Sequence, residues 1–217
     1  MREVQDGVTR LLAETVRAEI DSERCPPWLR RPGRIECLAL WETASAIYGA
    51  LTGLVLPELA PPREGRRLDV LLTYENGDRQ ILEVDEEQHF TAARALTLEH
   101  YPAGVRIGFD ASQWLARCHT RTGKERGGGF ARPRPPLFPG EGGRHRQRAF
   151  RDALADLLPP LHGWLPTIRI SDTEATAVTS AQDAAQSLRT LLHGRGVPVS
   201  SLVPVRGAAG SVLRPRS

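Results

Sequence analysis

The sequence predicts an α/β protein with a mixed central sheet flanked by helices. Two short apolar runs, residues 68–72 and 81–84, lie on either side of a turn that contains Asn76 and Gly77, a pattern typical of a β-hairpin. Longer segments before and after the hairpin carry apolar side chains at helical spacing. Strands and helices are therefore expected to share one core.

The expected elements follow the order helix, hairpin, strand, helix, strand. Apolar side chains at helical spacing predict a first helix at residues 8–20 and a second at 35–54, and Pro26, Pro27 and Pro32 break the chain between them. Further helices are expected at residues 91–100, 111–118, 144–158 and 183–192, and further strands at 105–109 and 167–170.

The length of 217 residues suffices for one domain with a substantial core. We expect a single domain over residues 1–171, with a Gly-, Pro- and Arg-rich insertion at about 120–143. A C-terminal helix and an extended tail are expected over residues 172–217.

Composition argues against several other classes of protein. No apolar run approaches membrane-spanning length, and the early Glu3 and Asp6 argue against a secretory signal. Cys25, Cys37 and Cys118 show no Cys-x-x-Cys spacing, which argues against structural zinc and against a disulfide framework. We therefore expect a cytoplasmic protein with no membrane partner.

Three carboxylates interrupt the apolar runs of the hairpin. Asp69 lies in the first run, and Glu83 and Asp85 lie in the second. Charged side chains are rarely buried unless they are paired or bound to a metal ion. The hairpin is therefore predicted to bind a hard cation, with a surface hairpin whose charges face water as the alternative.

The turn decides whether these carboxylates share a face of the sheet. Residues directly opposite in an antiparallel pair point to the same side. A two-residue loop at 76–77 would pair Asp69 with Val84, whereas a three-residue loop at 75–77 would pair Asp69 with Glu83. The sequence allows both loops, and the cation site requires the second or a bulge elsewhere.

An Asp in a first strand, followed by a hairpin and by LEVDEEQHF, resembles the active-site pattern of the PD-(D/E)XK nuclease superfamily. The resemblance is to the Glu-x-Asp-x-x-Gln-His variant of small very-short-patch-repair-like and homing-type endonucleases. It implies a restriction-endonuclease-like αβββαβ core. Asp69 and Glu83 match the two acids, and Asp85 stands where the usual lysine would be.

A second stretch, RQRAFRDALADLLPPLHGWLPTIRI, resembles the basic helix and last strand of the same nucleases. The matching residues are Arg151, Asp152, Leu154, Gly163, Trp164 and Arg169.

The resemblance also implies a chemistry. Asp69, Glu83 and the backbone carbonyl of Val84 would hold Mg²⁺ or Mn²⁺, with Asp85 on the same ion or a second one. The role of the missing lysine would fall to Gln88, His89 or an arginine, or would be absent.

Glu42 matches the acid that superfamily members often carry on the helix before the first acidic strand. An exposed position on that helix is the alternative interpretation.

Basic residues are concentrated after the hairpin. Residues 117–151 hold ten basic and two acidic side chains, a formal charge of +8 in a chain of net +3. Arg144, Arg146, Arg148 and Arg151 are expected to contact phosphates. A solvated arginine-rich loop is the alternative.

The sequence thus predicts a Mg²⁺- or Mn²⁺-dependent endonuclease that acts on nucleic acid, with DNA favoured over RNA. Two alternatives are a catalytically degenerate nuclease fold that only binds nucleic acid and a component of a defence or toxin complex. A homodimer or a larger complex is left open.

Overall fold

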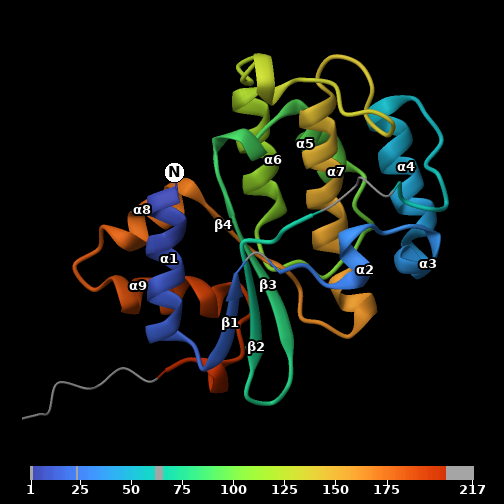
Figure 1. The fold of residues 1–217 in the computed structure, drawn as a ribbon. Helices are drawn as coiled ribbons and strands as arrows, with labels where there is room; N and C mark the ends of the chain where they lie inside the picture. Colours follow the sequence, from blue (N-terminus) through green and yellow to red (C-terminus); the bar gives the residue numbers. More distant parts are fainter. Residues whose placement is uncertain (1, 23, 62–65, 204–217) are drawn as a thin grey trace, which may run out of the picture.

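The computed structural model describes residues 2–22, 24–61 and 66–203 and places four strands in one mixed sheet (Figure 1). The strands lie in chain order: β1 (Ala18–Ser22), β2 (Val70–Tyr74), β3 (Arg79–Asp85) and β4 (Ile168–Ser171). β1, β2 and β3 form an antiparallel meander, and β4 pairs with β3 in parallel. The predicted α/β class and mixed sheet are therefore confirmed.

Helices cover both faces of the sheet. Figure 1 shows one layer formed by α1 (Arg2–Thr15), α8 (Asp172–Thr179) and α9 (Ala184–Gly194). The other layer contains α2 (Pro27–Arg30), α3 (Arg34–Cys37), α4 (Trp41–Thr52), α5 (Ala92–Glu99), α6 (Ala111–Arg121) and α7 (Gly143–Leu157). The expected flanking of the sheet by helices is confirmed.

Side chains of β3 alternate between the two layers because the strand is pleated. Leu82 and Val84 pack against α1, α8 and α9 in one apolar core. Ile81 belongs to the second core, with α4 and α7, and Glu83 and Asp85 share its side of the strand. Two buried acids therefore lie between the sheet and the layer that contains α7.

Four of the predicted helices form close to their expected bounds. Residues 91–100, 111–118, 144–158 and 183–192 correspond to α5, α6, α7 and α9. Asp110 and Asp183 cap α6 and α9, because their carboxylates accept backbone N–H groups of the first turn.

The two N-terminal helices differ from expectation. The helix expected at residues 8–20 ends at Thr15, because Val16, Ala18 and Ile20 also fit the two-residue period of a strand and β2 is available to pair with it. The helix expected at 35–54 is divided into α3, a short helix η1 (Leu38–Leu40) and α4. Its break lies at Leu38, whose φ of 50° leaves the helical region.

The strand expected at residues 105–109 does not form; in the described chain this segment contributes an isolated bridge between Gly108 and Ile168. The insertion at 120–143 holds the short helix η3 (Gly128–Phe130). Two further short helices are η2 (Glu87–His89) and η4 (Pro159–His162).

The C-terminal residues contribute more to the core than a single helix. α8 was not expected, and both α8 and α9 pack on α1 through buried residues such as Ala175 and Leu188. The described end of the chain holds η5 (Val199–Ser201) and a bridge from Leu202 to Val16. The remainder of the expected tail, residues 204–217, lies outside the described residues.

The hairpin turn has the three-residue loop. The Tyr74 N–H donates to the Asp78 carbonyl at 2.9 Å, and Gly77, with φ of 86°, donates to the Tyr74 carbonyl at 2.9 Å. Val70 pairs with Leu82, so one step further along the ladder Asp69 lies opposite Glu83. This register confirms the prediction that the two acids share one face of the sheet.

The positive φ of Gly77 should make this turn sensitive to substitution. Gly77→Ala is expected to lower the free energy of unfolding by about 1 kcal/mol, and Gly77→Asn by less, because an L side chain other than asparagine or aspartate is strained there. Urea unfolding measures the change. Gly129→Ala is the control, since an added Cβ meets nothing within 4 Å and φ is ordinary there. Equal stability of Gly77→Ala and the wild type would contradict the turn geometry.

Candidate active site

Asp69 and Glu83 meet where β2 begins and β3 approaches its end. The Val84 N–H donates to Asp69 Oδ2 at 2.9 Å, and the Asp69 N–H lies 3.4 Å from Glu83 Oε2. Both side chains, together with Val84, line a cavity of about 340 Å³. The structure therefore brings together three of the four predicted ligand positions.

Both carboxylates are costly to keep ionised in this cavity. Burial raises the pKa of Asp69, and the Val84 hydrogen bond only partly opposes it. Burial and the neighbouring Asp69 charge raise the pKa of Glu83 to about 8, against the lowering effect of Arg66 and Arg169. Two crowded acids of this kind favour a proton or a cation between them.

Asp85 does not join this pair. It is fully buried, and its Oδ2 accepts the Trp114 indole N–H at 2.7 Å while its Oδ1 accepts Arg169 Nη1 at 2.6 Å. It is not among the residues that line the cavity. The prediction that Asp85 is a metal ligand is therefore not supported by its placement, because both of its oxygens already have partners on α6 and β4.

The donor set that remains is small. Among the described residues, no group of three or more histidine, cysteine, aspartate or glutamate side chains is arranged to hold a metal ion. Mg²⁺ usually keeps several waters and is held by one or two carboxylates. Asp69 and Glu83 fit a hard ion of that kind, provided that Glu83 is released from the arginine that contacts it.

That arginine is Arg66, which sequence reasoning missed. Its Nη2 lies 2.9 Å from Glu83 Oε1, and the two side chains are only 7% and 9% exposed. Its Nη1 also donates to the backbone carbonyl of Arg151. The two consecutive arginines just before the hairpin were the available signal, but nothing in their spacing indicates a partner on β3.

A buried charge network lies beneath the cavity. Arg169 contacts Asp85 and Asp156 at 2.6 Å each and Asp152 at 3.5 Å. Arg94 contacts the second oxygen of Asp156 at 2.6 Å. Three carboxylates thus surround two guanidiniums, which leaves one excess negative charge in this group.

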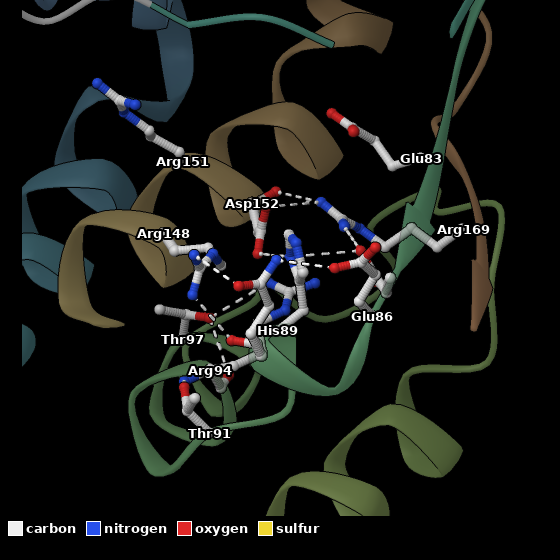
Figure 2. Close-up of polar contacts among 12 residues, drawn as sticks. Glu83, Glu86, His89, Thr91, Arg94, Thr97, Arg148, Arg151, Asp152 and Arg169 are labelled. Atoms are coloured by element: carbon white, nitrogen blue, oxygen red, sulfur yellow. Dashed lines mark hydrogen bonds and ion pairs between the residues drawn. The ribbon is translucent and has the colours of Figure 1, made fainter. Parts of the chain in front are cut away.

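His89 supplies the balancing charge. Its Nδ1 lies 2.9 Å from Asp152 Oδ2 and 3.5 Å from Asp85 Oδ1, and Figure 2 shows Asp152 between His89 and Arg169. Burial alone would lower the pKa of His89, but the charges of Asp152 and Asp85 outweigh it and raise that pKa. Burial opposes the ionised form of Asp152 in turn, yet His89 and Arg169 hold its pKa well below the usual range. The charges of Asp152 and Asp85 therefore favour the protonated form of His89 at the edge of the cavity.

Three of the four predicted arginines line the same cavity. Arg144, Arg148 and Arg151 lie on one face of α7, at the spacing i, i+4, i+7. Arg146 points elsewhere, and its guanidinium donates to the carbonyls of Pro139 and Glu141 at 3.1 and 2.7 Å. The helical period could have separated Arg146 from the other three.

The α7 arginines form a crowded basic surface. Burial lowers the pKa of Arg144 to about 10, and the charges of Arg148, Arg134, Arg151 and Arg132 add to the effect. So many positive charges are expensive to hold together without an anion nearby. This arrangement favours a polyanionic ligand.

Gln88 also lines the cavity, and its orientation is fixed by neighbours. Arg148 donates to the Gln88 carbonyl at 3.0 Å and to Gln88 Oε1 at 3.3 Å. The amide of Gln88 donates to Glu86 at 3.0 Å. Glu42, by contrast, is exposed on α4 and does not line the cavity, in agreement with the alternative interpretation of that residue.

Comparison of the chain with family models, curated proteins and solved structures gave no match, so any assignment rests on the geometry. Over the described residues, the helices are too short or too polar for any of them to span a bilayer.

The His89 network should make stability depend on pH. An imidazolium with a raised pKa contributes stability below about pH 6.5, and this contribution is lost as the pH rises through the folded-state pKa. His89→Gln is therefore expected to destabilise the protein most at pH 6 and progressively less as the pH rises through the folded-state pKa of His89, as measured by urea unfolding. His119→Gln is the control, since that side chain is 57% exposed. A difference that does not shrink with rising pH would show that His89 is neutral in the folded protein.

Proposed function

We propose that this protein is a metal-dependent nuclease that hydrolyses phosphodiester bonds of nucleic acid, with DNA as the favoured substrate. One observation carries the proposal: a pair of carboxylates, Asp69 and Glu83, shares a cavity with the basic face of α7. Acids can hold a hard cation, and arginines can hold phosphates. Hydrolysis of a phosphodiester in nucleic acid uses both a bound cation and basic side chains that hold the phosphates.

The element order supports the same proposal. α1, β1, β2, β3, α7 and β4 follow the αβββαβ order of restriction-endonuclease-like proteins if β1 takes the place of the strand expected at 105–109. The helices α2 to α4, between β1 and β2, and α5 and α6, between β3 and α7, are then additions to that order. Asp69 directly precedes β2, the first strand of the hairpin, and Glu83 lies near the end of β3, its second strand. These are the positions that the resemblance to PD-(D/E)XK nucleases assigns to the two acids.

In the proposed reaction, the acidic and basic residues of the cavity would have different roles. Asp69 and Glu83 would hold the ion, and Arg144, Arg148 and Arg151 would hold the nucleic acid backbone. When bound, Mg²⁺ or Mn²⁺ supplies an activated water and neutralises charge on the scissile phosphate.

His89 would act as the cation that the motif lysine normally supplies. Its Nδ1 is held by Asp152, which leaves Nε2–H to donate toward a phosphate oxygen or the leaving oxygen. Lys124, the one lysine of the chain, is not positioned for this role, because its Nζ donates to the Thr120 carbonyl at the exposed end of α6.

A catalytically degenerate module that only binds nucleic acid is the second candidate. Two observations favour it: Asp85 replaces the lysine and is fully engaged in the buried network, and Arg66 already neutralises Glu83. Such a protein would use the α7 arginines alone. Cleavage in the presence of metal separates the two candidates.

The purified protein is expected to cut DNA in Mg²⁺ or Mn²⁺ and to stop in EDTA. Glu83→Gln should lower the cleavage rate by about 100-fold or more, because metal catalysis supplies several kcal/mol of transition-state stabilisation. Plasmid and oligonucleotide cleavage assays measure this rate.

Glu87→Gln is the matched control for this substitution, since Glu87 pairs with Arg121 and Arg126 at the surface and should keep the wild-type rate. Absence of any metal-dependent cleavage with intact binding would favour the binding module instead.

Binding should depend on the cavity arginines and on salt. Replacing Arg144, Arg148 and Arg151 together with glutamine is expected to flatten the salt dependence of duplex binding, by roughly 0.9 in log–log slope for each phosphate that is no longer neutralised. Fluorescence anisotropy in EDTA at several salt concentrations measures the slope. Arg146→Gln should leave the slope unchanged, because this guanidinium is held by backbone carbonyls outside the cavity. Equal slopes for the triple variant and the wild type would show that the α7 face is only solvated.

A further inference from the structure

Arg66 occupies the carboxylate oxygen that a bound cation would need. Its guanidinium lies 2.9 Å from Glu83 Oε1, and Glu83 Oε2 faces the Asp69 N–H at 3.4 Å. Both partners of the ion pair are buried. In the absence of metal, the charge of Glu83 is thus met by an arginine from the segment just before β2.

This ion pair does not fully balance the two acids. Asp69 and Glu83 together carry two negative charges when ionised, and Arg66 contributes one positive charge and contacts Glu83. A divalent cation would supply two charges and could reach both carboxylates.

The surroundings of Arg66 allow an exchange. Its side chain lines the 340 Å³ cavity, and its other terminal nitrogen donates to a backbone carbonyl of α7, so one bond that holds Arg66 in the cavity would remain after its contact with Glu83 is broken.

We propose that Arg66 is the counter-ion that Mg²⁺ or Mn²⁺ displaces from Glu83, an exchange that sets the metal affinity of this site. The inference rests on the proposed function, because it assumes that Asp69 and Glu83 hold the metal. It assigns to Arg66 a positioning role: the residue neutralises the acids in the metal-free protein and gives way when the ion binds.

Mn²⁺ titration of the full chain, followed by calorimetry or by the electron paramagnetic resonance of free Mn²⁺, tests the exchange. Arg66→Gln is expected to bind Mn²⁺ about tenfold more tightly than the wild type or better, because binding no longer breaks a charge-assisted hydrogen bond. Arg148→Gln is the matched control: it removes the same charge from the same cavity, but its guanidinium bonds Gln88. Its Mn²⁺ affinity should change by no more than about threefold.

The outcomes distinguish this inference from the proposed function. Equal or weaker Mn²⁺ binding by Arg66→Gln, with measurable binding by the wild type, overturns the exchange and leaves the metal site standing. No Mn²⁺ binding by any of the three proteins overturns both.

A crystal structure of the wild type grown with Mn²⁺ gives a test that needs no variant. Arg66 should no longer contact Glu83 Oε1 in that structure. An ion on Glu83 with Arg66 still at hydrogen-bond distance would overturn the exchange even if Arg66→Gln failed to fold.

Discussion

The rest of the structure depends on the ion pairs that the buried guanidinium of Arg169 makes. This guanidinium links β4 to β3 through Asp85 and to the crossover helix α7 through Asp152 and Asp156. Each of these charges would be costly to bury alone, so none can be removed without exposing the others to that cost. Because Asp152 in turn holds His89, the same network that joins the sheet to α7 also sets the chemistry at the bottom of the cavity.

Local sequence patterns predicted part of the site. Strand parity limited the hairpin to two registers, and the three-residue loop found in the structure selects the one that places Asp69 opposite Glu83. The sequence grouped Arg146 with Arg144, Arg148 and Arg151, whereas the structure turns Arg146 away from the cavity. The short strand β1 was missed because its apolar spacing also suits a helix until β2 is present to pair with it.

The role of Asp85 could not be predicted from the sequence. Its spacing of two residues from Glu83 puts both acids on the same strand face, but the partners of Asp85 lie on α6 and β4, far along the chain. A shared strand face therefore did not bring Asp85 into the cavity with Glu83, because the partners of a buried acid depend on which cations and hydrogen-bond donors the tertiary structure places next to it. The basic side chains at the cavity therefore come from outside β3: from Arg66 before β2, from His89 after β3 and from the arginines of α7.

The parallel pairing of β3 with β4 has a consequence for how the chain assembles. β3 ends at Asp85, and β4 begins only at Ile168, after α5, α6 and α7. During synthesis, Asp85 of β3 is made well before Arg169, so it lacks this partner until the last strand docks. Closing so long a segment is slow compared with forming the hairpin. The cavity is thus a late product of folding, and a nascent or truncated chain that lacks β4 would hold the acidic motif without an organised site around it.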